Sequence, residues 1–170
     1  MLEAALLASL LVAGLWIVVQ DYRSLEIEAW IIYAYTAVAA LIATLVPLPG
    51  VDVTARLVGG ALGAGVTGIF RIYFLKVRKI EGLGEADIWV AAAAGFLVGP
   101  FLLGPWLFVS SLLAAAFLVG NSAFFGVREH PDEDIERNVI PLTPIQIATS
   151  FAIFLALLTG LVPADQIPLL

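Results

Sequence analysis

The fold is decided by a charge-free apolar run at residues 4–19, AALLASLLVAGLWIVV. A second such run, AAAAGFLVGPFLL, occupies residues 91–103. Neither run alternates polar and apolar residues, as the strands of an outer-membrane barrel would. With its apolar flanks, each instead approaches the ~20 residues that a helix needs to cross the hydrocarbon core of a bilayer. The sequence therefore predicts membrane-spanning helices.

The composition of the whole chain agrees with this prediction. Of the 170 residues, 62% are hydrophobic and only 13% are charged, and the mean hydropathy is +1.05. In a soluble domain about half of the residues are apolar and about a quarter are charged. We therefore expect an all-α, polytopic membrane protein. Residues 1–170 should form a single transmembrane domain with no separate soluble domain.

The breaks between the apolar runs divide the chain into about six predicted transmembrane helices. Proline and glycine, which end helices, cluster at residues 47–50, 99–100 and 104–105. An alternative is that residues 88–122 form one kinked segment, but about 35 residues are too many for a single crossing. The predicted helices are 3–20, 29–46, 55–75, 88–103, 105–122 and 144–162.

The basic residues predict the orientation of the chain in the membrane. In the six-helix interpretation, Arg56 lies on one side and every other basic residue lies on the opposite side. These others are Arg23, Arg71, Lys76, Arg78, Lys79, Arg128 and Arg137. Because basic residues concentrate in cytoplasmic loops, we expect loops 21–28, 76–87 and 123–143 to face the cytoplasm. Both termini should then lie outside.

The composition also argues against several kinds of site. The chain has no cysteine, which excludes a disulfide framework and a cysteine-based zinc site. Its net charge of −6 does not suggest a nucleic-acid partner. The one histidine, His130, lies among carboxylates with no ordered ligand spacing. We therefore expect neither a metal nor a cofactor.

Two aspartates are the candidate catalytic residues. Asp21 directly follows the first apolar run, and Asp87 directly precedes the run that begins at Ile88. Both belong to the predicted cytoplasmic ends of their helices, and ionisable residues near membrane depth often mark functional sites. Two neighbouring carboxylates can share one proton, so that the ionised one accepts a proton from water while the other polarises a carbonyl. The alternative is that Asp87 caps a helix and that Asp21 is a solvated boundary residue.

The sequence around both aspartates resembles the type IV prepilin peptidase family. In DYRSLEIEAW, residues 21–30, a basic residue follows the aspartate by two positions and an isoleucine comes a few positions later. The segment GLGEAD at 82–87, followed by AAAAG at 91–95, is similar to the family's Gly-x-Gly-Asp motif and the small-residue helix after it. The segment IPLTP at 140–144 is similar to the proline-rich start of the last helix.

The resemblance implies a function and a substrate. It implies an intramembrane aspartic endopeptidase, with Asp21 and Asp87 as the catalytic pair. This enzyme would remove a short basic leader from type IV prepilin-like or preflagellin precursors at the cytoplasmic face of the cell membrane. Its partners would be that protein substrate and the lipid bilayer. The motif and substrate-positioning roles carry over to Gly84, Glu85, Ala86 and Arg23.

Several departures from the family pattern indicate which branch of the family the chain resembles and which activity it is expected to lack. Ala86 replaces the second glycine of the motif, which resembles the archaeal branch of preflagellin and prepilin peptidases. The paired-cysteine loop and the long first cytoplasmic domain of many bacterial members are missing, so we expect no N-methylating activity. Glu28 follows the first motif's isoleucine where proline is frequent.

An acidic segment between the last two predicted helices is a second candidate site. We hypothesise that its carboxylates attract the basic leader of the substrate by electrostatic steering. The alternative is an ordinary solvated loop. The residues concerned are Glu129, Asp132, Glu133, Asp134 and Glu136.

Two other functional classes remain open at this level. The first is a small proton-coupled transporter that relays protons through Asp21 and Asp87, although transporters usually place such carboxylates near the bilayer midplane. The second is a non-catalytic assembly subunit with the same fold. Separately, the small-residue pairs Gly59/Gly63 and Gly60/Ala64 predict a close approach of another backbone to the third helix.

Overall fold

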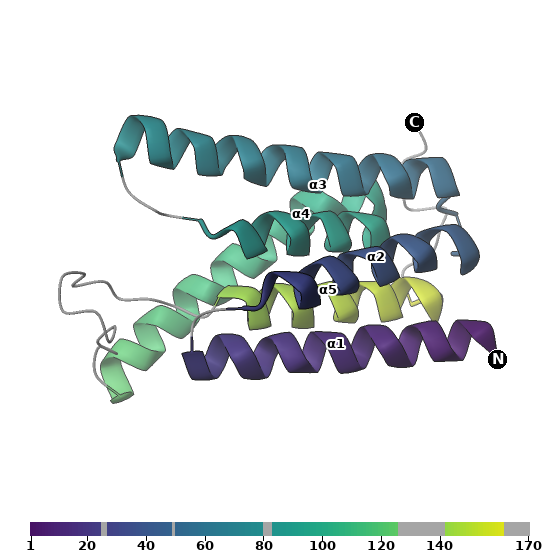
Figure 1. The fold of residues 1–170 in the computed structure, drawn as a ribbon, viewed down its shortest axis with the longest axis horizontal. Helices are drawn as coiled ribbons and strands as arrows, with labels where there is room; N and C mark the ends of the chain where they lie inside the picture. Colours follow the sequence, from purple (N-terminus) through teal and green to yellow (C-terminus); the bar gives the residue numbers. More distant parts are fainter. Residues whose placement is uncertain (25–26, 49, 80–82, 126–141, 162–170) are drawn as a thin grey trace.

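The computed structural model describes residues 1–24, 27–48, 50–79, 83–125 and 142–161. Its helices lie side by side in one elongated bundle (Figure 1). Within the described residues there is no strand beyond an isolated bridge between Leu48 and Val51. The all-α prediction is therefore confirmed. The elements are α1 (Leu2–Ser24), α2 (Ala29–Leu45), α3 (Val53–Tyr73), the π-helical turn η1 (Phe74–Arg78), α4 (Glu85–Phe125) and α5 (Leu142–Leu158).

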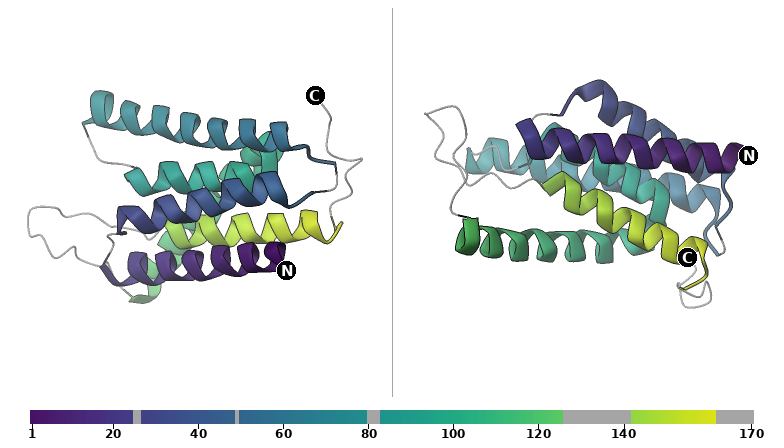
Figure 2. Two further views of the ribbon diagram at one scale, coloured as in Figure 1. Left: turned by 45° about the vertical axis from the view of Figure 1, so that its right-hand side comes forward. Right: turned by 90° about the horizontal axis from the view of Figure 1, so that it is seen from below.

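The longest element, α4, reverses direction within the bundle. Its helical geometry is interrupted at Gly99, where φ is 76° and ψ is 175°. Glycine tolerates this positive φ, and Pro100 can begin the next helical turn because its missing N–H would have no partner there. Two arms result, 85–98 and 100–125, and the second returns toward the end where α4 begins (Figures 1 and 2). The predicted division at 99–100 is confirmed, whereas the predicted break at 104–105 is wrong because Pro105 lies inside the second arm.

Within the described residues, three helical segments are long and apolar enough to cross a membrane: Leu2–Asp21, Val53–Arg78 and Glu85–Phe117. Ala29–Leu45 and Thr143–Leu158 are shorter apolar helices. The segment Glu85–Phe117 contains the reversal at Gly99. A multi-pass membrane protein fits this pattern, and the count of six crossings stays a prediction.

A tight turn leads from α2 into α3. The Val51 N–H donates a hydrogen bond of 3.3 Å to the Leu48 carbonyl, and Gly50 takes a left-handed φ of 73°. Asp52 then caps α3, because its side chain accepts a hydrogen bond of 2.6 Å from the Ala55 N–H. This bond satisfies one of the N–H groups that a helix start leaves unpaired.

Helices α3 and α4 pack through their backbones. A Cβ on Gly63 would overlap the carbonyl of Ala91, and a Cβ on Gly59 would overlap the backbone at Gly95 and Gly99. The predicted close approach to the third helix is therefore confirmed. Gly65, in contrast, has nothing within 4 Å of such a Cβ and lies on the other side of α3.

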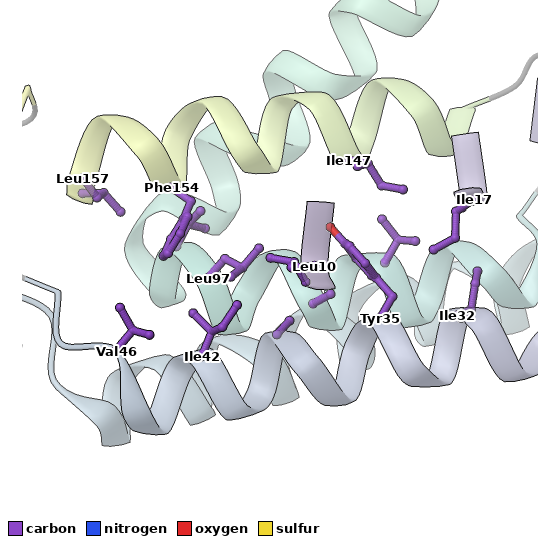
Figure 3. Close-up of a cluster of buried hydrophobic side chains, with 14 of the residues drawn as sticks. Leu10, Ile17, Ile32, Tyr35, Ile42, Val46, Leu97, Ile147, Phe154 and Leu157 are labelled. Atoms are coloured by element: carbon purple, nitrogen blue, oxygen red, sulfur yellow. The ribbon is translucent and has the colours of Figure 1, made fainter. Parts of the chain in front are cut away.

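The apolar core joins α1 and α2 to α5 and the first arm of α4. Side chains from these four elements point toward one another in Figure 3. Among them Leu10, Ile42, Leu97 and Phe154 are fully buried, and the Tyr35 ring is 1% exposed. This core holds the C-terminal end of α1 in a fixed position relative to the N-terminal end of α4, where the two candidate aspartates lie.

Candidate active site

Asp21 lies inside α1, in its last turn, because the helix continues to Ser24 and not only to the predicted residue 20. Its side chain is buried, with 6% of its surface exposed. Thr143, in the first turn of α5, donates hydrogen bonds to the Asp21 carboxylate from its hydroxyl group and from its backbone N–H. Among the described residues the Asp21 Oδ2 atom has no hydrogen-bond partner. The interpretation of Asp21 as a solvated boundary residue is therefore wrong.

Asp87 occupies the first turn of α4, which begins at Glu85 and so three residues earlier than predicted. Its side chain is 8% exposed. The Gly84 N–H donates a hydrogen bond of 2.9 Å to Asp87 Oδ2. This is the backbone half of a capping box, in which an acidic side chain in the first turn reaches back to the N–H that precedes the helix. Asp87 therefore stabilises the start of α4 while its carboxyl group stays buried.

The structure brings the two aspartates together. They come from the end of α1 and the start of α4, which lie at the same end of the bundle (Figure 1). The charge of Asp87 acts on the Asp21 carboxylate, so the two groups lie within electrostatic range of each other. Two buried carboxylates in such an arrangement are suited to sharing a proton.

The motif residues around Asp87 have distinct surroundings. Glu85 is exposed and accepts a hydrogen bond of 3.1 Å from the Tyr33 hydroxyl on α2. Ala86 is half-buried and packs against the apolar core. A Cβ on Gly84 would meet Asp87 Oδ2 at 3.6 Å, an ordinary contact, so the structure indicates a role as N–H donor for this glycine. Arg23 is exposed in the last turn of α1.

Hydrogen bonds at the edge of the site link the end of α1 to the residue that precedes α2. Glu28, which precedes α2, accepts a hydrogen bond of 3.2 Å from the Gln20 side-chain amide and another from the Trp30 indole. The Tyr33 ring meets the Trp89 ring edge-on, with 5.1 Å between the ring centroids. These contacts place a polar and aromatic border beside the two buried aspartates.

A model of the type IV leader peptidase family matches residues 6–119. The chain belongs to the type IV leader peptidase family. The matched range contains Asp21, Asp87 and the Gly84–Ala86 motif, and it ends before α5. Comparisons with curated proteins and with solved structures gave no match. The family match indicates a protein of a protease family. The apolar helices fit a protein that is embedded in a membrane.

Sequence reasoning did not predict the contact between Thr143 and Asp21. Thr143 lies in the proline-rich segment that carries the resemblance at the start of the last helix, yet its spacing in the sequence gives no sign of a bond to Asp21. The predicted acidic leader-binding residues of segment 129–136 and His130 lie outside the described residues. Within the described residues, no group of three metal-ligating side chains occurs.

Proposed function

We propose that this protein is an intramembrane aspartic endopeptidase that removes the leader from type IV prepilin-like or preflagellin precursors at the cytoplasmic face of the membrane. One observation carries the proposal: two buried aspartates, from different helices, interact at one end of the bundle. Within a family of leader peptidases, such a pair is suited to hydrolysing a peptide bond.

The chemistry follows from the pair. The ionised carboxylate accepts a proton from a water molecule, whose oxygen attacks the scissile carbonyl carbon. The protonated carboxyl group donates to the carbonyl oxygen, which becomes a hydroxyl in the tetrahedral intermediate. When the intermediate collapses, the C–N bond breaks and the first carboxyl group gives the proton that it took from water to the leaving nitrogen. The second carboxylate takes a proton from a hydroxyl group as the C=O bond re-forms, so both groups return to their starting protonation states.

The position of the pair supports the proposed cytoplasmic face. Arg23 at the end of α1, and Lys76, Arg78 and Lys79 after α3, lie at the same end of the bundle as the aspartates. Basic residues of this kind favour the cytoplasmic side of a membrane. Ala86, which stands where the family motif has its second glycine, resembles the archaeal branch and supports preflagellin-like and archaeal prepilin-like precursors as the substrates.

The proposal is tested by leader removal from a prepilin-like or preflagellin precursor, using the purified protein in liposomes. Asp21→Asn and Asp87→Asn should each lower the rate by about 10²–10⁴-fold, as expected for the loss of general acid–base catalysis. The matched control is Asp52→Asn, because Asp52 is exposed and asparagine caps helices equally well. This control should cleave at the wild-type rate.

Other outcomes overturn the proposal in different ways. Full activity in either Asp21→Asn or Asp87→Asn would exclude the aspartic mechanism. A wild-type protein that is folded but cleaves no leader-bearing precursor would favour a proton-coupled transporter or a non-catalytic assembly subunit. Proton-coupled uptake into the same liposomes would then distinguish these two.

A further inference from the structure

Thr143 connects the start of α5 to the first candidate aspartate. Its side chain is 4% exposed, and both of its donors, the hydroxyl group and the backbone N–H, bond to the Asp21 carboxylate. The two residues are far apart in the sequence and meet where α1 and α5 pack together. This contact is the polar link from α5 to the aspartate pair in the described part of the chain.

The position of Thr143 at the start of α5 explains why its backbone N–H is available as a donor. The first N–H groups of a helix have no partner within it, and Thr143 occupies the first turn. Pro144 follows, and proline is tolerated there because its missing N–H would have been unpaired. The positive end of the α5 dipole therefore also lies near the Asp21 carboxylate. Since threonine is branched at Cβ, its χ1 angle is restricted, which limits the directions that the hydroxyl group can take.

We propose that Thr143 is a positioning residue that holds the Asp21 carboxylate in the orientation needed for catalysis by the aspartate pair. This inference rests on the proposed aspartic peptidase function and adds a residue of α5 that acts on the pair through Asp21.

The two carboxyl groups differ in the number of hydrogen bonds that hold them. Asp21 accepts two hydrogen bonds from Thr143, whereas Asp87 accepts one from the Gly84 N–H. Two donors from one residue restrict the orientation of a carboxylate more than a single donor does. The Asp21 Oδ2 atom is buried without a partner among the described residues, and it can accept a hydrogen bond from the attacking water.

A merely structural Thr143 is the competing explanation, and the experiment separates the two. Thr143→Val removes the hydroxyl group and keeps the shape and the backbone N–H, whereas Thr143→Ser keeps the hydroxyl group. The matched control is Thr149→Val on the same helix, because Thr149 is also buried but its hydroxyl group bonds to the Ile145 carbonyl of α5 itself. Leader cleavage in liposomes gives kcat and KM, and thermal unfolding in detergent gives stability.

The expected result is a change in kcat alone. Thr143→Val should lower kcat by about 10–100-fold, the size expected for losing a hydrogen bond to a charged group, with KM within about twofold of wild type. Thr143→Ser should recover most of the rate. Thr149→Val should retain the wild-type kcat and unfold at a temperature close to that of Thr143→Val. Thr143→Ala is the second variant if the valine variant does not fold.

Three results would overturn the inference. They are a wild-type kcat in Thr143→Val, a loss confined to KM, or an equal loss in Thr143→Ser and Thr143→Val. Asp21→Asn and Asp87→Asn are measured in the same assay. If those variants are inactive and Thr143→Val is fully active, only the positioning role fails. If those variants are active, the proposed peptidase mechanism fails first.

Discussion

Arg56 lies almost completely inside the protein, 1% exposed, in the first turn of α3. This start of α3 lies at the opposite end of the bundle from the end of α1 and the start of α4 (Figure 1). The Arg56 Nη1 donates a hydrogen bond of 2.6 Å to the Val46 carbonyl, and its Nε donates one of 3.0 Å to the Phe96 carbonyl. It therefore joins the end of α2 to the first arm of α4, just before the reversal at Gly99. This role explains why the one basic residue on the predicted outer side does not contradict the charge rule, which concerns exposed loops.

Removing this guanidinium group should destabilise the fold. Arg56→Ala leaves two buried carbonyl groups without donors, and we expect the free energy of unfolding to fall by about 2–4 kcal/mol. Arg56→Lys supplies one donor and should recover part of the loss. Denaturant unfolding in detergent micelles measures both. Lys76→Ala, at an exposed position, is the control and should change stability by no more than about 0.5 kcal/mol. An equal effect of Arg56→Ala and the control would contradict the proposed linking role.

The residues of the candidate site differ in how far the sequence could predict them. Asp21 and Asp87 could be found because a carboxylate at the end of an apolar run is unusual and because motifs surround both. The distance in space between the two aspartates could not be predicted, since it depends on how the helices that carry them pack in the bundle. Thr143 carries no such mark, because its role exists only through a contact with a distant residue. The bond from Gly84 to Asp87 was also missed, since the predicted helix began after both residues.

At the scale of elements, the contact between α3 and α4 depends on glycines that touch backbone. Gly63→Ala should lower the free energy of unfolding by about 1–3 kcal/mol, because the new methyl group overlaps the Ala91 carbonyl and neither backbone can move away. Gly65→Ala is the matched control two residues along the same helix. It has open space and should be neutral or stabilising by up to about 1 kcal/mol, since alanine favours helix more than glycine. Equal unfolding midpoints for the two variants would rule out the close packing.

The same elements show what local sequence can and cannot determine. Glycine followed by proline occurs at 99–100 and again at 104–105, and both pairs predict a helix end. Only Gly99 adopts a positive φ, and it does so against Val51, whose Cγ1 would lie 3.2 Å from an added Cβ. Gly104 stays helical with nothing nearby. The dipeptide permits a reversal, and packing against the turn between α2 and α3 decides which of the two is used.

At the scale of the whole molecule, two polar regions lie at opposite ends of the bundle. One end of the bundle holds the end of α1, the starts of α4 and α5 and the π-helical turn η1, and the start of α3 lies at the other end (Figures 1 and 2). The first group of segments carries the aspartates, Thr143 and the basic residues after α3, whereas the start of α3 carries Arg56 and the Asp52 cap. Apolar side chains fill the bundle between them (Figure 3). Such a division is the one expected when a bilayer surrounds the middle of the bundle and water meets both ends.

This division predicts which positions can be reached from each side of the membrane. Because the chain has no cysteine, single cysteines can be labelled without background. Thr54 lies in the first turn of α3, and Gly104 lies five residues after the reversal of α4 at Gly99; both are exposed. Thr54→Cys and Gly104→Cys should react with a membrane-impermeant maleimide in intact cells. Arg78 is exposed at the end of η1, which lies at the same end of the bundle as the end of α1 (Figure 1). Arg78→Cys should therefore react only after permeabilisation. Labelling in denaturing detergent controls for the reactivity of each thiol. If Gly104→Cys reacts from the same side as Arg78→Cys, the two arms of α4 do not cross the membrane separately, and the six-crossing prediction is wrong.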